Sequence, residues 1–139
     1  MARVMAFGTF DGVHKGHEYF LKTAKSHGTE LVVVIARDET IEIVKARAPV
    51  RSEKQRAKDV KALKIADKVV LGNKRDKLRI IERYKPDVIC LGYDQQAFTS
   101  SLEEDLMRRN LTPTILRLGS FKPEIYKSSI IEPSYSPQP

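Results

Sequence analysis

Two histidines near the start of the chain, His14 and His17, are the residues whose type and spacing point most directly to chemistry. They stand three residues apart, so both imidazoles project from one side of a helix that begins near His14. Backbone N–H groups at a helix N-terminus attract phosphate. Imidazoles beside them can donate hydrogen bonds to a phosphorus centre as charge develops in a transition state. The pair therefore indicates electrostatic catalysis at a phosphate group, without a covalent intermediate.

Two other interpretations of the pair are open at this stage. Histidines at this spacing also bind zinc, although neither a cysteine nor a matching third histidine stands nearby. The remaining histidine, His27, lies at the far end of the same predicted helix. Alternatively, both side chains are merely structural. We predict no metal ligands in the protein itself.

The histidines belong to a loop, residues 8–17, that reads GTFDGVHKGH. Its glycines and lysine have the wrong spacing for a Walker A loop and for the GxGxxG pattern. Gly16 removes a side chain where a phosphate oxygen would approach. Asp11 fits two roles, a catalytic base or an acceptor that fixes the loop through backbone N–H groups.

Short apolar runs alternate with segments of helical periodicity along the chain. Strands are predicted at residues 3–7, 31–36, 68–72, 88–91 and 114–118. Helices are predicted at residues 17–26, 52–63, 75–84, 102–109 and 128–131. The alternation predicts an α/β fold, a doubly wound, Rossmann-like parallel sheet of five strands with helices on both faces. Because function in such a sheet lies at the carboxyl ends of the strands, the loop after the first strand is a candidate site.

The composition is that of an ordinary globular protein, since 41% of the 139 residues are hydrophobic and 31% are charged. We expect one domain over residues 1–131 and a flexible, proline-rich tail at residues 132–139. The formal charge of +7 favours anionic partners such as nucleotides, phosphate or nucleic acid. No apolar run approaches the roughly 20 residues that a bilayer requires, and no signal peptide is evident, so a cytoplasmic location is expected.

The single cysteine, Cys90, excludes an intramolecular disulfide and a cysteine-based zinc cluster. It lies in the apolar run Asp87–Leu91, which predicts a buried strand. We therefore expect an inert core thiol rather than a nucleophile.

Basic residues are concentrated between residues 45 and 58, where Glu53 is the only acidic residue. The basic residues are Lys45, Arg47, Arg51, Lys54, Arg56 and Lys58. A solvated helix face explains Lys54 and Lys58.

The stretches GTFD at residues 8–11 and HxGH at residues 14–17 resemble the motif of the cytidylyltransferase-like nucleotidyltransferases. That motif is similar to the HIGH motif of class I aminoacyl-tRNA synthetases, and the resemblance covers residues 3–131. It implies that His14 and His17 embrace a nucleoside triphosphate and stabilise the transition state at its α-phosphorus. It implies further nucleotide contacts in the same loop, at Thr9 and Phe10 through their backbone and at Lys15 and Gly16.

The resemblance also implies roles for basic residues beyond the second strand. Lys45 and Arg47 would lie in a loop over the nucleotide phosphates and bind them. Arg56 matches an arginine early in the following helix and would be the catalytic cation beside the leaving pyrophosphate.

Four further nucleotide-binding residues are expected toward the C-terminus. Asp94 follows the fourth predicted strand and would hold a ribose hydroxyl or Mg²⁺, or cap the next turn. Phe121 would stack on an adenine or help to close the core. Ser128 and Ser129 match a pair that touches nucleotide phosphates in the family, although helix capping explains one serine equally well.

The sequences LGYDQ at residues 91–95 and ARDET at residues 36–40 are most similar to the archaeal FAD synthases of this superfamily. That similarity implies transfer of AMP from ATP to FMN, with Mg²⁺ or another divalent cation accompanying ATP. The alternative within the same chemistry is a CTP:glycerol-3-phosphate cytidylyltransferase, and the remote alternative is a small basic nucleic-acid-binding domain. Either enzyme would take a phosphomonoester, FMN or glycerol 3-phosphate, and would need neither nucleic acid nor a membrane. A homodimer is common in the family.

Overall fold

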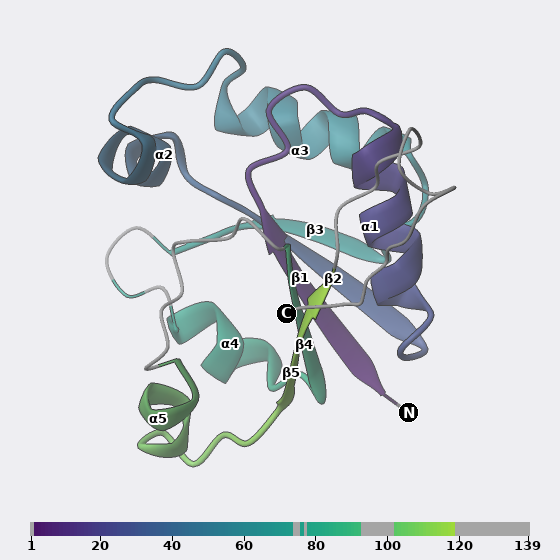
Figure 1. Ribbon diagram of the computed structural model, residues 1–139, viewed down its shortest axis with the longest axis vertical. Coiled ribbons are helices and arrows are strands. Elements are labelled where there is room, and N and C mark those ends of the chain that lie inside the picture. The colour runs from purple at the N-terminus through teal and green to yellow at the C-terminus, as the bar shows by residue number, and fades with distance from the viewer. Residues whose placement is uncertain (1, 74–75, 77, 93–101, 119–139) are drawn as a thin grey trace, which may run out of the picture.

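The computed structural model describes residues 2–73, 76, 78–92 and 102–118 of the chain. Strands and helices alternate through these ranges except between the second and third strands, where two helices follow one another, as Figure 1 shows. In chain order the elements are β1 (Arg3–Gly8), α1 (Lys15–Lys25), β2 (Glu30–Ile35), α2 (Asp38–Lys45), α3 (Glu53–Ala62), β3 (Lys68–Leu71), α4 (Arg79–Tyr84), β4 (Val88–Gly92), α5 (Leu102–Met107) and β5 (Thr114–Leu118).

The described strands form one parallel sheet in the order β3-β2-β1-β4-β5. This confirms the predicted doubly wound, Rossmann-like α/β architecture. β1 lies in the middle, where Met5 is the register partner of Val32 in β2 and of Ile89 in β4. Strand order runs outward from β1 to β3 on one side and from β4 to β5 on the other. The topological switch point, where such sheets bind ligands, therefore lies at the carboxyl ends of β1 and β4.

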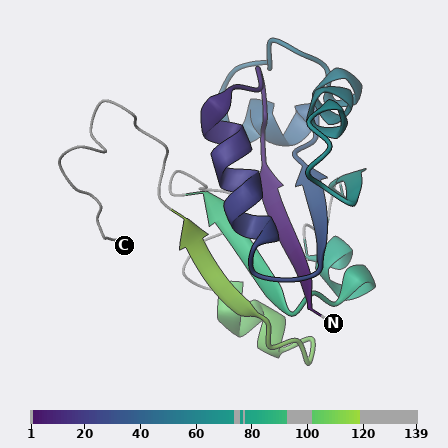
Figure 2. The same ribbon diagram turned by 90° about the vertical axis from the view of Figure 1, so that its right-hand side faces the viewer.

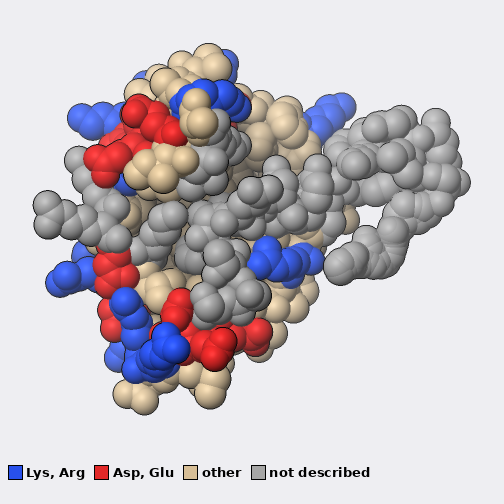
Figure 3. Space-filling model, turned by 60° about the vertical axis from the view of Figure 1, so that its left-hand side comes forward, with Lys and Arg blue, Asp and Glu red and all other residues tan. Residues whose placement is uncertain are grey.

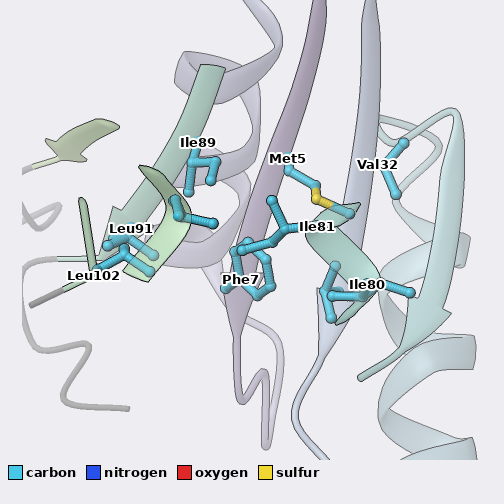
Figure 4. Packing of buried hydrophobic residues seen from close by; sticks show 10 residues of the cluster. Met5, Phe7, Val32, Ile80, Ile81, Ile89, Leu91 and Leu102 are labelled. Carbon is cyan, nitrogen blue, oxygen red and sulfur yellow. The ribbon is translucent and has the colours of Figure 1, made fainter. Parts of the chain in front are cut away.

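The strands bury side chains on both faces, so the molecule has two hydrophobic clusters separated by the sheet. Met5 faces α4 and α5, and Figure 4 shows it beside Ile81 of α4. Val33 faces the opposite way, toward Leu21 of α1 and Val60 of α3. In the view of Figure 2, α1 crosses in front of the sheet along β1. The start of α1 is thereby held close to the switch point.

Local sequence explains where α1 and α3 begin. Ser52 caps α3 by accepting a hydrogen bond from the Gln55 N–H at 3.2 Å. Val60 is fully buried and Leu63 packs partly buried beside it, as the predicted apolar stripe requires. The helix α1 begins at Lys15, two residues earlier than predicted, because His14 caps it.

The helices after β3 and β4 are shorter than predicted. The described helix α4 begins at Arg79 instead of residue 75, and α5 ends at Met107 instead of residue 109. Asp76 accepts a hydrogen bond from the Leu78 N–H at 3.1 Å and so holds a turn ahead of α4. Asn110, with φ of 62°, lies in the left-handed region just past α5. Side-chain periodicity does not fix such ends, because they depend on local capping.

The helix α2 was not predicted. Among its described side chains Ile41 is buried, while Ile43 is 77% exposed. It ends at Lys45, after which Ala46 takes a left-handed conformation with φ of 56°. The expectation that Lys45 lies in a loop is therefore wrong, whereas Arg47 does lie in the exposed segment that follows.

Cys90 is fully buried in β4, and burial raises the pKa of its thiol to about 12. The expected inert core thiol is confirmed, because the thiolate does not form at neutral pH. None of the described helices combines the length and the apolar character that a membrane crossing needs. The predicted helix at residues 128–131 and the predicted tail at residues 132–139 lie outside the described residues.

Candidate active site

The helix α1 opens with a capping box made by two histidines. The Nδ1 atom of His14 accepts a hydrogen bond from the Gly16 N–H at 3.0 Å. The Nδ1 atom of His17 accepts one from the His14 N–H at 3.2 Å. In most capping boxes Ser or Thr fills the first position and Glu or Gln the second. Here two histidines accept the same reciprocal hydrogen bonds from backbone N–H groups at the helix terminus.

This capping arrangement assigns the tautomer of both rings. A nitrogen that accepts a hydrogen bond from a backbone N–H carries no proton, so in the neutral imidazole the proton resides on Nε2. In the neutral form of both His14 and His17, the ring N–H donor is therefore Nε2. Such donors suit the oxygens of a phosphate that gains charge in a transition state.

The two rings lie close together, as the spacing predicted. Their centroids are 4.1 Å apart, and the ring planes are inclined by 37°. His14 is exposed and His17 is half-buried at the carboxyl edge of the sheet. Lys15, the first residue of α1, is exposed, and the N–H of Gly16 is used by His14.

Thr9 and Phe10 form the turn that leads from β1 to this helix. The carbonyl of Thr9 accepts a hydrogen bond from Nη1 of Arg56 at 2.9 Å. Phe10 as a whole residue is only 2% exposed, so its ring offers no stacking surface to a nucleotide. The nucleotide contacts themselves stay predictions.

Arg56 lies in the interior rather than at the surface of the site. It is fully buried, and its three side-chain nitrogens donate to protein acceptors. The acceptors are the Arg51 carbonyl at 3.0 Å, the Thr9 carbonyl at 2.9 Å and Asp38 Oδ1 at 2.6 Å. A guanidinium so enclosed does not face a leaving pyrophosphate. The direct contact expected between Arg56 and pyrophosphate is therefore not supported. Instead, the buried side chain acts as a bracket, which here means that its hydrogen bonds join the loop after β1 to the segment that carries Asp38 and Arg51.

Asp11 fixes a neighbouring loop, which is one of the two roles considered for it. Its carboxylate accepts hydrogen bonds from the Val50 N–H at 2.7 Å and the Arg51 N–H at 2.9 Å. Desolvation raises the pKa of Asp11. The hydrogen bonds from Val50 and Arg51, together with the charge of Arg56, outweigh that effect and bring the pKa below its ordinary value of 3.8. A carboxylate held ionised by two N–H donors is a poor catalytic base.

Two further acids, Asp38 and Glu53, complete the framework and were not singled out from the sequence. Glu53 accepts from the Asp38 N–H at 2.9 Å and from Arg37 at 3.0 Å. These hydrogen bonds, chiefly the one from the Asp38 N–H, lower the pKa of Glu53 despite partial burial. Arg37 in turn donates to the Gly72 carbonyl at the end of β3. The signal available in the sequence was a pair of acids that are the first residues of two successive helices, Asp38 of α2 and Glu53 of α3.

The remaining predicted site residues are Arg47, which the structure describes, and four residues that it does not. Arg47 is exposed in the segment between α2 and α3. Asp94, Phe121, Ser128 and Ser129 lie outside the described residues. Within the ranges that the structure does describe, no three His, Cys, Asp or Glu side chains are grouped so that they could hold a metal ion.

Comparison with known proteins identifies the family. A family model described as cytidylyltransferase-like matches residues 5–132. The chain belongs to this cytidylyltransferase-like family. The membership predicted from the GTFD and HxGH stretches is confirmed, and the chain is a nucleotidyltransferase.

Individual members of the cytidylyltransferase-like family resemble the chain over most of its length. The FAD synthase of Thermococcus sibiricus is 41% identical over 133 residues, which are 95% of this chain and 87% of the relative. The FAD synthase of Methanosarcina mazei is 44% identical over 118 residues, which are 85% of this chain and 77% of the relative. A solved structure named as a lipopolysaccharide core biosynthesis protein, from Thermoplasma volcanium, is 38% identical with a TM-score of 0.82. It covers 88% of this chain and 99% of its own chain.

Proposed function

We propose that the chain is an FMN adenylyltransferase, an FAD synthase, which transfers AMP from ATP to FMN and releases pyrophosphate. Its archaeal relatives named FAD synthase are 41–44% identical to it over most of the chain. The observation that carries the mechanism is the pair of imidazoles at the start of α1, with centroids 4.1 Å apart.

The reaction needs charge stabilisation more than proton transfer. An oxygen of the FMN phosphate attacks the α-phosphorus of ATP in line. The new P–O bond forms while the bond to the α,β-bridging oxygen breaks, and that oxygen leaves with pyrophosphate. No general base is required, because the attacking phosphate is already ionised at neutral pH. The Nε2–H groups of His14 and His17 would donate to the oxygens on which negative charge gathers.

The counter-charge for pyrophosphate comes from two sources in this proposal. A divalent cation such as Mg²⁺ enters with ATP as part of the substrate. Arg47, exposed in the segment after α2, supplies a positive charge that can reach the phosphates. Lys45, now at the end of α2, keeps the phosphate-binding role that the resemblance implies. The nucleotide-binding roles implied by the resemblance are kept for Lys15, Asp94, Phe121, Ser128 and Ser129. Arg56 acts indirectly, by holding the Thr9 carbonyl.

Nucleic acid is not the favoured partner. Basic and acidic side chains are interspersed on the described surface shown in Figure 3, instead of forming a basic face. A nucleic-acid-binding domain relies on a continuous basic surface with stacking aromatics. The cytoplasmic location expected from the sequence and the homodimer that is common in the family stay predictions.

Product formation tests the proposal. The protein is incubated with Mg²⁺ and either ATP with FMN or CTP with glycerol 3-phosphate, and pyrophosphate and FAD are quantified. We expect one FAD for each pyrophosphate released from ATP. Pyrophosphate release only with CTP and glycerol 3-phosphate would show that these, and not ATP and FMN, are the substrates. Pyrophosphate release with neither pair would contradict both assignments.

A further inference from the structure

The turn between β1 and α1 contains a backbone conformation that an aromatic residue rarely adopts. Phe10 has φ of 55°, in the left-handed region. A bulky side chain is unfavourable there, and such residues persist where surrounding contacts over-determine them. Two contacts adjacent to the residue do so, namely the hydrogen bond from Arg56 to the Thr9 carbonyl and the packing of the Phe10 ring.

The conformation folds the Phe10 ring back over the end of β1. A Cβ atom placed on Gly8 would lie 2.6 Å from Cε2 and 2.8 Å from Cζ of that ring. Real Cβ atoms do not approach this closely, so the ring can occupy its place only because residue 8 is a glycine. Gly8 and Phe10 are therefore matched to each other.

The Phe10 ring also lies beside His17 of the histidine pair. The ring centroids of Phe10 and His17 are 5.2 Å apart, with an interplanar angle of 56°. Phe20 lies three residues after His17 in α1. Its ring centroid is 6.4 Å from that of Phe10, and it packs against the same hydrophobic cluster. The contacts of the His17 ring thus include the hydrogen bond from the His14 N–H at Nδ1 and the packing of the Phe10 ring against it.

We propose that Phe10 is a positioning residue that fixes the orientation and the tautomer of the His17 imidazole. In its absence the His17 ring would rotate away from the His14 N–H, and its proton would distribute between Nδ1 and Nε2. The Nε2–H donor would then face the α-phosphate for only part of the time. The kinetic consequence rests on the proposed adenylyl transfer, whereas the effect on the ring does not.

Phe10→Leu tests the kinetic consequence, with Phe20→Leu as a matched control that removes a ring from the same cluster. Phe10→Leu should lower kcat by roughly 10- to 100-fold, as misplacement of a catalytic group by about 1 Å does, while KM for ATP changes less than about twofold. Phe20→Leu should change kcat less than about threefold. In a His17→Ala background, Phe10→Leu should change kcat less than about twofold, because it acts through His17. An equal loss of kcat in both backgrounds, or equal effects of the two Leu variants, would overturn the proposal.

Nitrogen NMR of the histidine rings in the free protein gives a readout that is independent of the reaction. In the wild type and in Phe20→Leu, His17 should show one protonated Nε2 and one unprotonated Nδ1 at neutral pH. In Phe10→Leu the two nitrogen signals should move toward each other as the tautomers mix. Unchanged His17 nitrogen signals in Phe10→Leu would refute the positioning role. If the wild type forms no FAD, the proposed function fails and this measurement alone decides the inference.

Gly8→Ala provides a second variant should Phe10→Leu fail to fold. The added methyl group must displace the Phe10 ring, since it would come within 2.6 Å of it. We expect the same mixing of His17 tautomers as in Phe10→Leu. A single Nε2–H tautomer in a folded Gly8→Ala protein would contradict the proposal.

Discussion

At the residue scale, hydrogen bonds made by the backbone decide which nitrogen of each histidine is offered to substrate. The start of α1 donates the Gly16 N–H to His14 and the His14 N–H to His17. The unpaired N–H groups of a helix terminus thus orient both rings before any ligand binds. Preorganised donors of this kind need no rearrangement as charge develops, which is why they contribute to catalysis.

Loss of one of these donors should slow turnover without unfolding the protein. His17→Ala is expected to lower kcat by about 10²–10³-fold, the usual effect of removing one oxyanion donor. Steady-state pyrophosphate release with ATP and FMN measures it, and the far-ultraviolet circular dichroism should stay that of the wild type. His27→Ala, an exposed histidine after the same helix, is the control. A His17→Ala enzyme with wild-type kcat would argue against the catalytic role.

Arg56 should matter for stability as well as for turnover. Arg56→Met leaves the Thr9 and Arg51 carbonyls and the Asp38 carboxylate without their donor. Breaking a buried ion pair costs about 3–5 kcal/mol, and the 36% exposure of Asp38 places the expected loss near the lower limit, about 3 kcal/mol.

The control for Arg56 is Lys58→Met, which removes an equal charge from an exposed position of α3. Urea unfolding should show a change of less than about 0.5 kcal/mol for this variant. Comparable unfolding free energies for the two Met variants would mean that the buried bracket contributes nothing.

At the element scale, two polar clamps hold the segment that runs from the end of β2 to the start of α3. Glu53 binds Arg37 and the Asp38 N–H at one end of the segment. Asp11 binds the Val50 and Arg51 N–H groups at the other. Between them only Ile41 is buried among the described side chains. The position of the segment between β2 and α3 therefore depends on hydrogen bonds to carboxylates more than on hydrophobic packing.

Opening the second clamp should loosen residues 46–51. Asp11→Asn keeps one acceptor oxygen but directs an NH₂ group at a backbone N–H, so one hydrogen bond is lost. Hydrogen exchange over residues 46–51 should become at least several-fold faster. KM for ATP should rise more than kcat falls, since the segment carries Arg47.

Glu103→Gln is the control for this prediction, because it neutralises an exposed acid on α5, away from the clamp. It should leave exchange at residues 46–51 unchanged. Protection of that segment in Asp11→Asn equal to the wild type would show that the carboxylate does not hold it.

At the scale of the whole molecule, ionised carboxylates join segments distant in the chain. Lys25 binds Asp67, and Arg109 binds Asp76 in a bidentate pair. The side-chain hydrogen bond from Lys25 lowers the pKa of Asp67, and the one from Arg109 lowers the pKa of Asp76. The pKa of Asp11 is lowered as well, because two hydrogen bonds from backbone N–H groups, with the charges of nearby arginines, outweigh the effect of desolvation.

These pKa values make the fold sensitive to acid. The unfolded chain binds protons near the ordinary aspartate value of 3.8, whereas the folded protein binds them only at lower pH. The unfolded state thus holds more protons in this range, and the free energy of unfolding decreases as pH falls below about 4. Denaturant midpoints measured from pH 6 to pH 3 should decline, and less steeply in Asp76→Asn. A midpoint independent of pH over that interval would contradict the prediction.

Much of the architecture could be predicted from the sequence, because the signals for it are local. Continuous apolar runs specify buried parallel strands, and the strand bounds agree with the structure within one residue. The order of elements limits a parallel sheet to a few topologies. The helix α2 was missed because it has only eight residues, and its first N–H, that of Asp38, binds Glu53, which lies 15 residues further along the chain.

The sequence by itself determined the family, the sheet and the convergence of His14 and His17, because a helix of fixed geometry sets the relation between residues three apart. Only the tertiary structure decided that Arg56 is a buried bracket and that Asp11 is a clamp. Their partners Thr9 and Val50 lie 47 and 39 residues away in the chain. Periodicity and spacing describe neighbours along the chain, whereas burial and long-range hydrogen bonds arise only when distant segments pack together.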